Sequence, residues 1–122
     1  MYFTEEEKKA ITNVTLVMIL ADGKVEKEEL LTAFPILKAI GVESLEIAKD
    51  MDEADACSII SRMTDVEKKF VAALLGVIMA VDGDVDAKEL TIWQVVSTIC
   101  GLPTMNVYQA KLELADFVEK NM

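Results

Sequence analysis

The chain repeats one pattern, Asp-Gly-x-Val-x-x-x-Glu-Leu, in Val81-Asp82-Gly83-Asp84-Val85-Asp86-Ala87-Lys88-Glu89-Leu90 and in Ala21-Asp22-Gly23-Lys24-Val25-Glu26-Lys27-Glu28-Glu29-Leu30. Each copy follows one of the two most apolar segments of the sequence. An apolar helix is expected to end at each Asp-Gly turn, because glycine readily takes the left-handed conformation that ends helices. A second helix is expected to begin at the acidic residues, which are favoured in a first helical turn. The pattern therefore predicts an all-α fold.

The two turns belong to a longer repeat. Aligned without gaps at an offset of sixty, residues 4–42 and 64–102 share 11 identities in 39 positions, where unrelated sequences match at about two. Each copy begins with a capping-box sequence, Thr4-Glu5-Glu6-Glu7 or Thr64-Asp65-Val66-Glu67, and ends at a glycine. We therefore predict a single domain over residues 1–122 that is internally duplicated, with both copies folded alike.

The spacing of apolar residues predicts about seven helices and no strand. In the first half we expect helices from residue 5 to the turn at Gly23, from about 25 to 40, from Ser44 to about 50, and from 56 to 62. The second half repeats the first two, and a last helix is expected to start at Pro103-Thr104. Strict two-residue alternation, which is typical of strands, is missing where the apolar residues are dense.

The charge and hydropathy patterns exclude several classes of partner. A net charge of −10 argues against nucleic-acid binding, which depends on basic residues that neutralise phosphates. No basic cluster suits an anionic membrane surface, and the longest apolar run, 70–81, is too short to span a bilayer. The first residues, Met1-Tyr2-Phe3, lead directly into acidic ones and do not resemble a signal peptide. We expect a cytoplasmic protein.

The sequence contains no histidine, so it lacks the commonest general base and the usual zinc ligand. Cys57 and Cys100 each lie among apolar residues and do not form a Cys-x-x-Cys pair, so we expect two buried free thiols. The chain is therefore not expected to be an enzyme or to hold an organic cofactor.

The repeated pattern matches the second half of a calcium-binding EF-hand loop, including its Gly-x5-Glu spacing. The first half of such a loop would need oxygen ligands at Met18 and Leu20 in one copy, and at Ile78 and Ala80 in the other. These side chains are apolar, so an EF-hand is excluded.

Two explanations of the acidic residues remain open. Glu29 and Glu89 are placed to interact with the start of a helix, which is a purely structural role. Asp22 and Asp82 instead face the negative end of the preceding helix, at a cost of about 0.3–1 kcal/mol, so either local hydrogen bonds or a cation should compensate. Carboxylate oxygens suit calcium, magnesium or manganese. The candidate metal ligands are Asp22, Glu29, Asp82, Asp84, Asp86 and Glu89.

The second copy is the better candidate for a cation, because Asp84 and Asp86 stand where the first copy has Lys24 and Glu26. The carboxylates of the two copies could converge on one shared site or form two equivalent sites. Both arrangements are compatible with the sequence.

The apolar helix that runs into Ala-Asp-Gly-x-Val-x-x-x-Glu, in 20–30 and again in 80–90, resembles the tellurite-resistance TerB-like domains. These domains are all-helical and internally duplicated, and they include the N-terminal domain of a membrane-anchored DnaJ-like co-chaperone. The resemblance implies a link to tellurite resistance and stress response. It also implies a divalent metal held by the acidic motif residues, which match Asp22, Glu29, Asp82 and Glu89 here.

The sequence thus predicts a stress-response binding module in which a divalent cation neutralises the acidic turns and favours docking of a protein partner. The alternative is a metal-independent helical scaffold for protein interactions, whose acidic residues serve only as helix caps.

Overall fold

The computed structural model describes residues 2–21, 27–81 and 87–121. Within these ranges the chain forms six α-helices, one four-residue 3-10 helix and no strand. The helices are α1 (Glu5–Ile19), α2 (Lys27–Ala39), η1 (Leu45–Ala48), α3 (Glu53–Ser61), α4 (Asp65–Met79), α5 (Ala87–Cys100) and α6 (Val107–Asn121). The all-α prediction is confirmed. The number of α-helices is slightly lower than the seven expected, because the segment after Ser44 forms a single 3-10 turn.

Both capping boxes form as the sequence predicts. Thr4 Oγ1 accepts the Glu7 N–H at 3.1 Å, and Glu7 Oε1 accepts the Thr4 N–H at 2.8 Å. The Thr64 and Glu67 pair repeats this exchange at 3.2 and 2.9 Å. Each pair provides acceptors for two N–H groups that have no partner within the helix.

The start of α3 differs from the prediction. The helix begins at Glu53, three residues before the expected start at Ala56. The Asp52 carboxylate accepts the Asp55 N–H at 2.8 Å and so caps the helix. The acidic stretch that suggested a break therefore forms the cap and first turn, where negative charge is favourable.

The last helix begins later than Pro103-Thr104 suggested, at Val107. Asn106 Oδ1 accepts the Gln109 N–H at 2.8 Å, and Gln109 Oε1 accepts the Asn106 N–H at 2.9 Å. This reciprocal pair is a capping box made with amides. It fixes the start of the helix and leaves residues 102–106 as an extended connection.

Gly41 and Gly101 end α2 and α5 with positive φ angles of 101° and 67°. The Val42 N–H reaches back to the Leu37 carbonyl at 2.9 Å, the six-residue bond of a Schellman motif. Only glycine adopts this conformation without steric cost, so the predicted glycine stops are confirmed at both positions.

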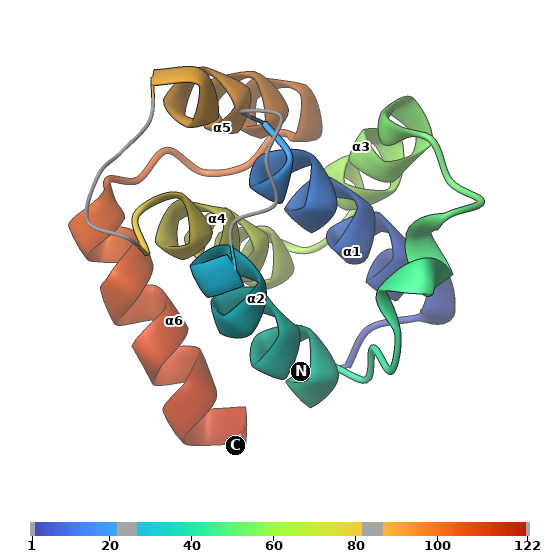
Figure 1. Cartoon of the computed structure of the whole chain (residues 1–122), viewed down its shortest axis with the longest axis horizontal. Coiled ribbons are helices and arrows are strands. Elements are labelled where there is room, and N and C mark those ends of the chain that lie inside the picture. The colour runs from blue at the N-terminus through green and yellow to red at the C-terminus, as the bar shows by residue number, and fades with distance from the viewer. Residues whose placement is uncertain (1, 22–26, 82–86, 122) are drawn as a thin grey trace.

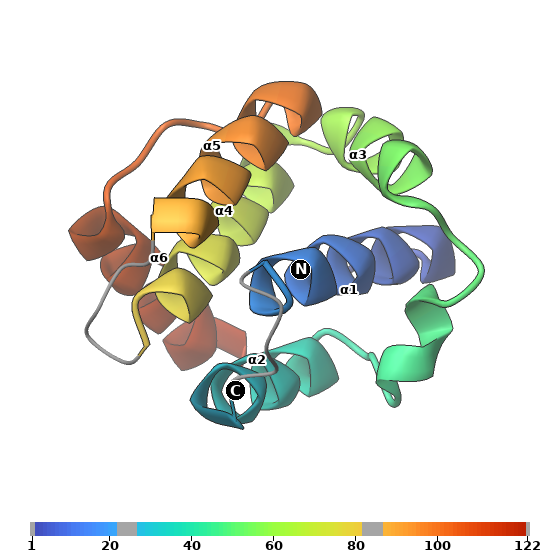
Figure 2. The ribbon, with the colours of Figure 1, turned by 45° about the horizontal axis from the view of Figure 1, so that its top comes forward.

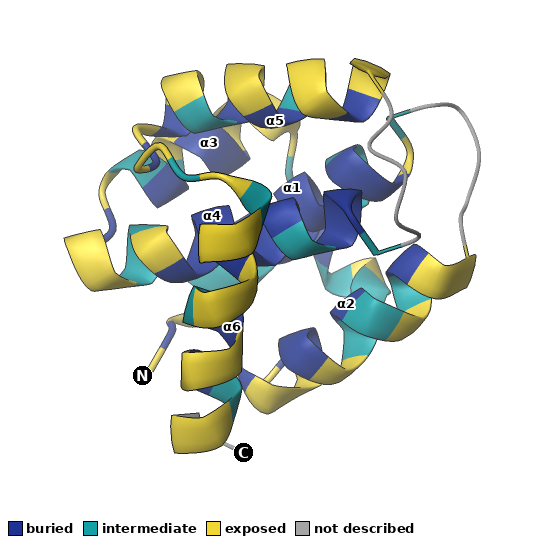
Figure 3. Cartoon of the chain, turned by 90° about the vertical axis from the view of Figure 1, so that its left-hand side faces the viewer, coloured by how far each residue is buried: buried dark blue, intermediate teal, exposed yellow. Residues whose placement is uncertain are grey.

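Helices α1 and α4 contact each other in the middle of the molecule. Helix α3 packs along α1, and α6 packs along α4. In Figures 1 and 2, α5 lies above this central pair and α2 lies below it. Figure 3 shows the same division by burial, with α4 mostly buried and α6 exposed along its outer side. Nine of the 15 residues of α4 are buried, as expected for the longest apolar run in the sequence.

Three aromatic rings join distant parts of the chain beside α4. The Phe70 ring centroid lies 5.7 Å from that of Phe3 and 4.4 Å from that of Phe117. Phe3 precedes α1 and Phe117 lies in α6, so both ends of the described chain pack on the start of α4. No helix in the described ranges combines the length and apolarity that crossing a membrane requires.

Gly76 allows α4 to lie close to two neighbours. A Cβ atom at this position would lie 2.8 Å from the Ala110 Cβ and 2.9 Å from the Trp93 Cζ2. These distances are shorter than ordinary van der Waals contact. Neither neighbouring atom is the end of a flexible side chain that could move away. The glycine therefore sets how closely α6 and Trp93 approach α4.

We expect Gly76→Ala to lower the free energy of unfolding by about 1–2 kcal/mol, because overpacking outweighs the better helix propensity of alanine. Urea unfolding measures this change. Ser58→Ala, at an exposed position of α3, is the control and should cause no loss. A Gly76→Ala protein as stable as the wild type would show that the helices can separate freely.

Cys57 in α3 and Cys100 at the end of α5 are buried free thiols, as predicted. Burial raises the pKa of the Cys100 thiol well above its ordinary value of 9.0, and a hydrogen bond with the Cys57 side chain and the charge of Cys57 act in the same direction. Cys100 therefore remains protonated at neutral and mildly alkaline pH, which makes it a poor nucleophile.

The raised pKa of Cys100 has a consequence for stability. The folded state holds this proton more tightly than the unfolded chain, so the contribution is complete below about pH 9 and is lost as the pH rises further. Cys100→Ala should be less stable than the wild type at pH 8 because of the cavity it leaves. Above pH 9 the difference should shrink by up to about 1.4 kcal/mol per pH unit. Urea unfolding at pH 8, 9 and 10 measures it, and a constant difference would contradict the expectation.

Candidate functional site

Two of the six candidate metal ligands, Glu29 and Glu89, lie in the described part of the chain. Asp22, Asp82, Asp84 and Asp86 fall in 22–26 and 82–86, outside the described residues. The site can therefore be built from its two glutamates.

Glu29 and Glu89 occupy the third position of α2 and α5, and both are buried, with 2% and 5% of their surface exposed. Their neighbours Glu28 and Lys88 are exposed. A carboxylate in the first turn of a helix lies near N–H groups that have no intrahelical partner and near the positive end of the helix dipole. Burial strengthens such interactions, because less water screens them.

The sequence predicted the helix-start position of these glutamates but not their burial. The pattern offers one signal for it. The third residue of each helix is acidic in both copies, whereas the residue before it changes from Glu28 to Lys88. The position that keeps its charge is the buried one.

The structure does not bring Glu29 and Glu89 into one cluster. They belong to α2 and α5, which lie on opposite sides of the central α1–α4 pair (Figure 1). Within 2–21, 27–81 and 87–121, no three His, Cys, Asp or Glu side chains form a group that could hold a metal ion. The described geometry thus provides one buried carboxylate at each of two separate places.

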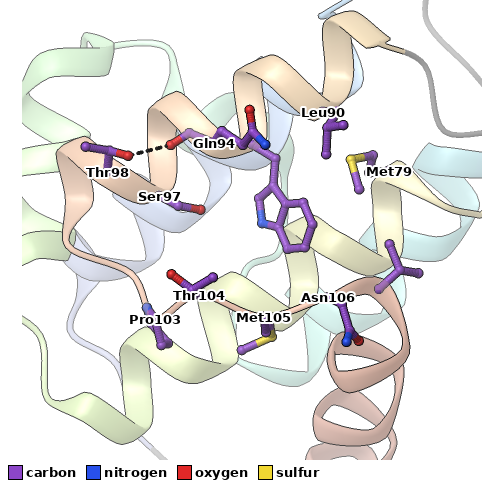
Figure 4. Close-up of a pocket in the computed structure, with 11 residues that line it drawn as sticks. Met79, Leu90, Gln94, Ser97, Thr98, Pro103, Thr104, Met105 and Asn106 are labelled. Atoms are coloured by element: carbon purple, nitrogen blue, oxygen red, sulfur yellow. Dashed lines mark hydrogen bonds between the residues drawn. The ribbon is translucent and has the colours of Figure 1, made fainter.

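A second feature, which the sequence did not reveal, is a pocket of about 380 Å³ between α5 and the connection that leads to α6. In Figure 4, Ser97 on α5 lies across from Thr104, and Met79 and Leu90 lie toward one end. Met79 ends α4, and Leu90 directly follows Glu89. The pocket therefore adjoins the described residues on either side of the second acidic turn.

Among solved structures, the chain is similar to the crystal structure of a protein of unknown function from Porphyromonas gingivalis W83. The two are 36% identical and superpose with a TM-score of 0.83, and the match covers 94% of this chain and 92% of that chain. No protein-family model and no curated protein matches the chain.

The two glutamates of the first turn of α2 offer a direct test of burial. Glu28→Gln and Glu29→Gln each remove one negative charge from the same helix start, but only Glu29 is buried. We expect Glu28→Gln to cost about 0.3–1 kcal/mol and Glu29→Gln up to about 2 kcal/mol, since the dipole interaction is stronger away from water. Urea unfolding with a metal chelator present measures both. Equal losses would show that the burial of Glu29 has no energetic effect.

Proposed function

The chain belongs to the same family as the Porphyromonas gingivalis protein of unknown function, and we propose that it is a non-catalytic binding module that takes up a divalent cation at its acidic turns. The observation that carries this proposal is the burial of Glu29 and Glu89 at matching positions, 2% and 5% exposed. A buried carboxylate needs nearby positive charge or N–H donors. The helix start supplies part of this, and a cation beside the turn supplies more.

We propose further that the two halves arose by internal duplication. Three pairs of features recur at an offset of sixty residues, namely the capping boxes, the positive-φ glycines and the buried glutamates. The helix contacts also correspond, since α3 packs along α1 as α6 packs along α4. These matches support two equivalent turns, each with its own fixed glutamate.

Oxygen ligands define the class of cation. The chain has no histidine, and both cysteines are buried, one in α3 and the other at the last residue of α5. Carboxylates alone favour calcium, magnesium or manganese over zinc or copper. Glu29 would be joined by Asp22, and Glu89 by Asp82, Asp84 and Asp86, so the second turn is proposed as the stronger site.

The position of α2 and α5 on opposite sides of the molecule favours two separate sites over one shared site. Each turn joins two helices that pack against each other, α1 with α2 and α4 with α5. A cation that neutralises the acidic residues of a turn would therefore stabilise the pairing of those helices. This change would favour docking of a protein partner, which is the mechanism we propose for regulation.

The resemblance of the repeated motif to TerB-like domains extends the proposal to a role in stress response, including tellurite resistance, in the cytoplasm. The all-helical fold is consistent with that resemblance. The residues that carry the resemblance are those proposed to hold the cation, so one experiment bears on both.

Titration with calcium, magnesium or manganese should raise the melting temperature and change the fluorescence of Trp93, which lies one turn after Glu89. A cation at ten times its Kd should add about 1.4 kcal/mol of stability, which is several degrees for a chain of this size. Asp82→Asn and Glu89→Gln should abolish most of the response. Glu28→Gln, which removes an exposed charge, should leave it intact.

The alternative is a metal-independent scaffold, favoured by the exposed apolar residues Val95 and Ile99, one turn apart on α5. It predicts no response to any of the three cations at millimolar concentration, with Glu89→Gln behaving alike with and without metal. That result would overturn the cation proposal. The scaffold would then be tested by whether Val95→Ser and Ile99→Ser together prevent partner binding.

A further inference from the structure

We propose that the pocket between α5 and residues 103–107 binds a small, uncharged and largely apolar molecule that accepts a hydrogen bond from the indole N–H of Trp93. This site is distinct from the described parts of the proposed cation sites, since neither Glu29, Glu89 nor any other carboxylate of the described residues lines it. The inference therefore holds or fails independently of metal binding.

The pocket has the size and walls of a small-molecule site. Its volume of about 380 Å³ falls within the range of roughly 300–1,000 Å³ that is common for ligand pockets. Met79, Leu90 and Met105 supply apolar surface, and methionine adapts readily to a bound molecule. Figure 4 shows Ser97 and Thr104 on facing sides of the space.

The indole of Trp93 supplies the specific polar contact. Trp93 lines the pocket and is 7% exposed, and its Nε1 atom is buried with no hydrogen-bond partner in the described structure. A buried N–H donor without an acceptor is unfavourable, and tryptophan in such a position usually has a partner. A ligand with a carbonyl-type oxygen would provide it.

Two other polar groups that line the pocket are already engaged in hydrogen bonds within the protein. The Thr98 hydroxyl donates to the Gln94 carbonyl at 2.8 Å, and the Asn106 side chain accepts the Gln109 N–H at 2.8 Å. These bonds hold the rim in place. Among the described residues that line the pocket, the indole N–H of Trp93 is the buried donor without a partner.

The charge of the site selects an uncharged ligand. None of the described side chains that line the pocket is charged, so an ionic ligand would lose its hydration without gaining a counter-charge from them. The net charge of −10 also disfavours anions. A neutral carbonyl compound satisfies the indole at no such cost.

The residues that make the pocket are specific to the second half of the chain. At an offset of sixty, Trp93 corresponds to Ala33 and Ser97 to the fully buried Leu37. Gly76, which corresponds to Leu16, leaves space for the Trp93 ring, whose Cζ2 would lie 2.9 Å from an added Cβ. These three differences between the halves act together. The glycine makes room for the indole, and the serine in place of leucine leaves the pocket open.

The test uses the single tryptophan of the full chain, which gives one indole N–H resonance in a ¹⁵N-labelled sample. The probes are acetophenone and α-methylstyrene, which have similar shapes but differ in that a C=CH2 group replaces the carbonyl. With a metal chelator present, acetophenone should shift the indole resonance to saturation and bind about tenfold more tightly, the contribution of one hydrogen bond.

Two variants make the test specific. Trp93→Phe keeps an aromatic ring but removes the donor, so ligand-observed NMR should find equal affinities for the two probes. Ser97→Leu places in the pocket the residue found at position 37, and it should abolish binding of both probes while the indole resonance shows a folded protein.

Equal binding of both probes by the wild type would overturn the proposal, because it would mean that the bound probe accepts no hydrogen bond from the indole N–H. Failure of acetophenone to bind below about 1 mM, an affinity of only ~4 kcal/mol, would overturn it as well. Unchanged binding by Ser97→Leu would place the probe elsewhere and have the same consequence.

Discussion

The packing of α4 against four other helices, α1, α2, α5 and α6, is the interaction on which the rest of the structure depends. Six consecutive residues of α4, from Phe70 to Leu75, are each at most 4% exposed. A helix buried this completely has no stable solvent-exposed alternative, because burial of each large apolar side chain contributes about 1.5–3 kcal/mol. The positions of α2 and α5, and hence of both buried glutamates, follow from it.

Local signals predicted much of the fold because they act over a few residues. The capping boxes at Thr4 and Thr64 and the glycine stops at 41 and 101 depend only on neighbours within six positions. The predicted starts of α3 and α6 were wrong for a related reason. The acidic stretch at 50–55 suggests a break and Pro103 suggests a helix start, but Asp52 and the Asn106–Gln109 pair act as the caps.

The candidate site was less predictable, because its properties are tertiary. One sequence signal, the charge kept at 29 and 89 but changed between Glu28 and Lys88, is consistent with burial of the third helix residue, but it does not show which neighbours bury that residue. The burial arises because one side of α2 faces α1 and α4, and one side of α5 faces α4 and α3. The pocket was equally hidden, since its walls come from α4, α5 and the connection after Gly101. Sequence spacing cannot bring residues 79, 93 and 104 together.

Under the proposed duplication, the two halves share one backbone arrangement but differ at the positions beside the pocket. At the position equivalent to Trp93 the first half has Ala33, which is 1% exposed and belongs to the core. In the second half the larger indole packs against Gly76, and Ser97 stands at the position that corresponds to the core residue Leu37. Such exchanges cost packing, because they remove apolar contacts from a close-packed interior. The second half therefore has, beside the described ends of its acidic turn, the pocket that we propose as a binding site.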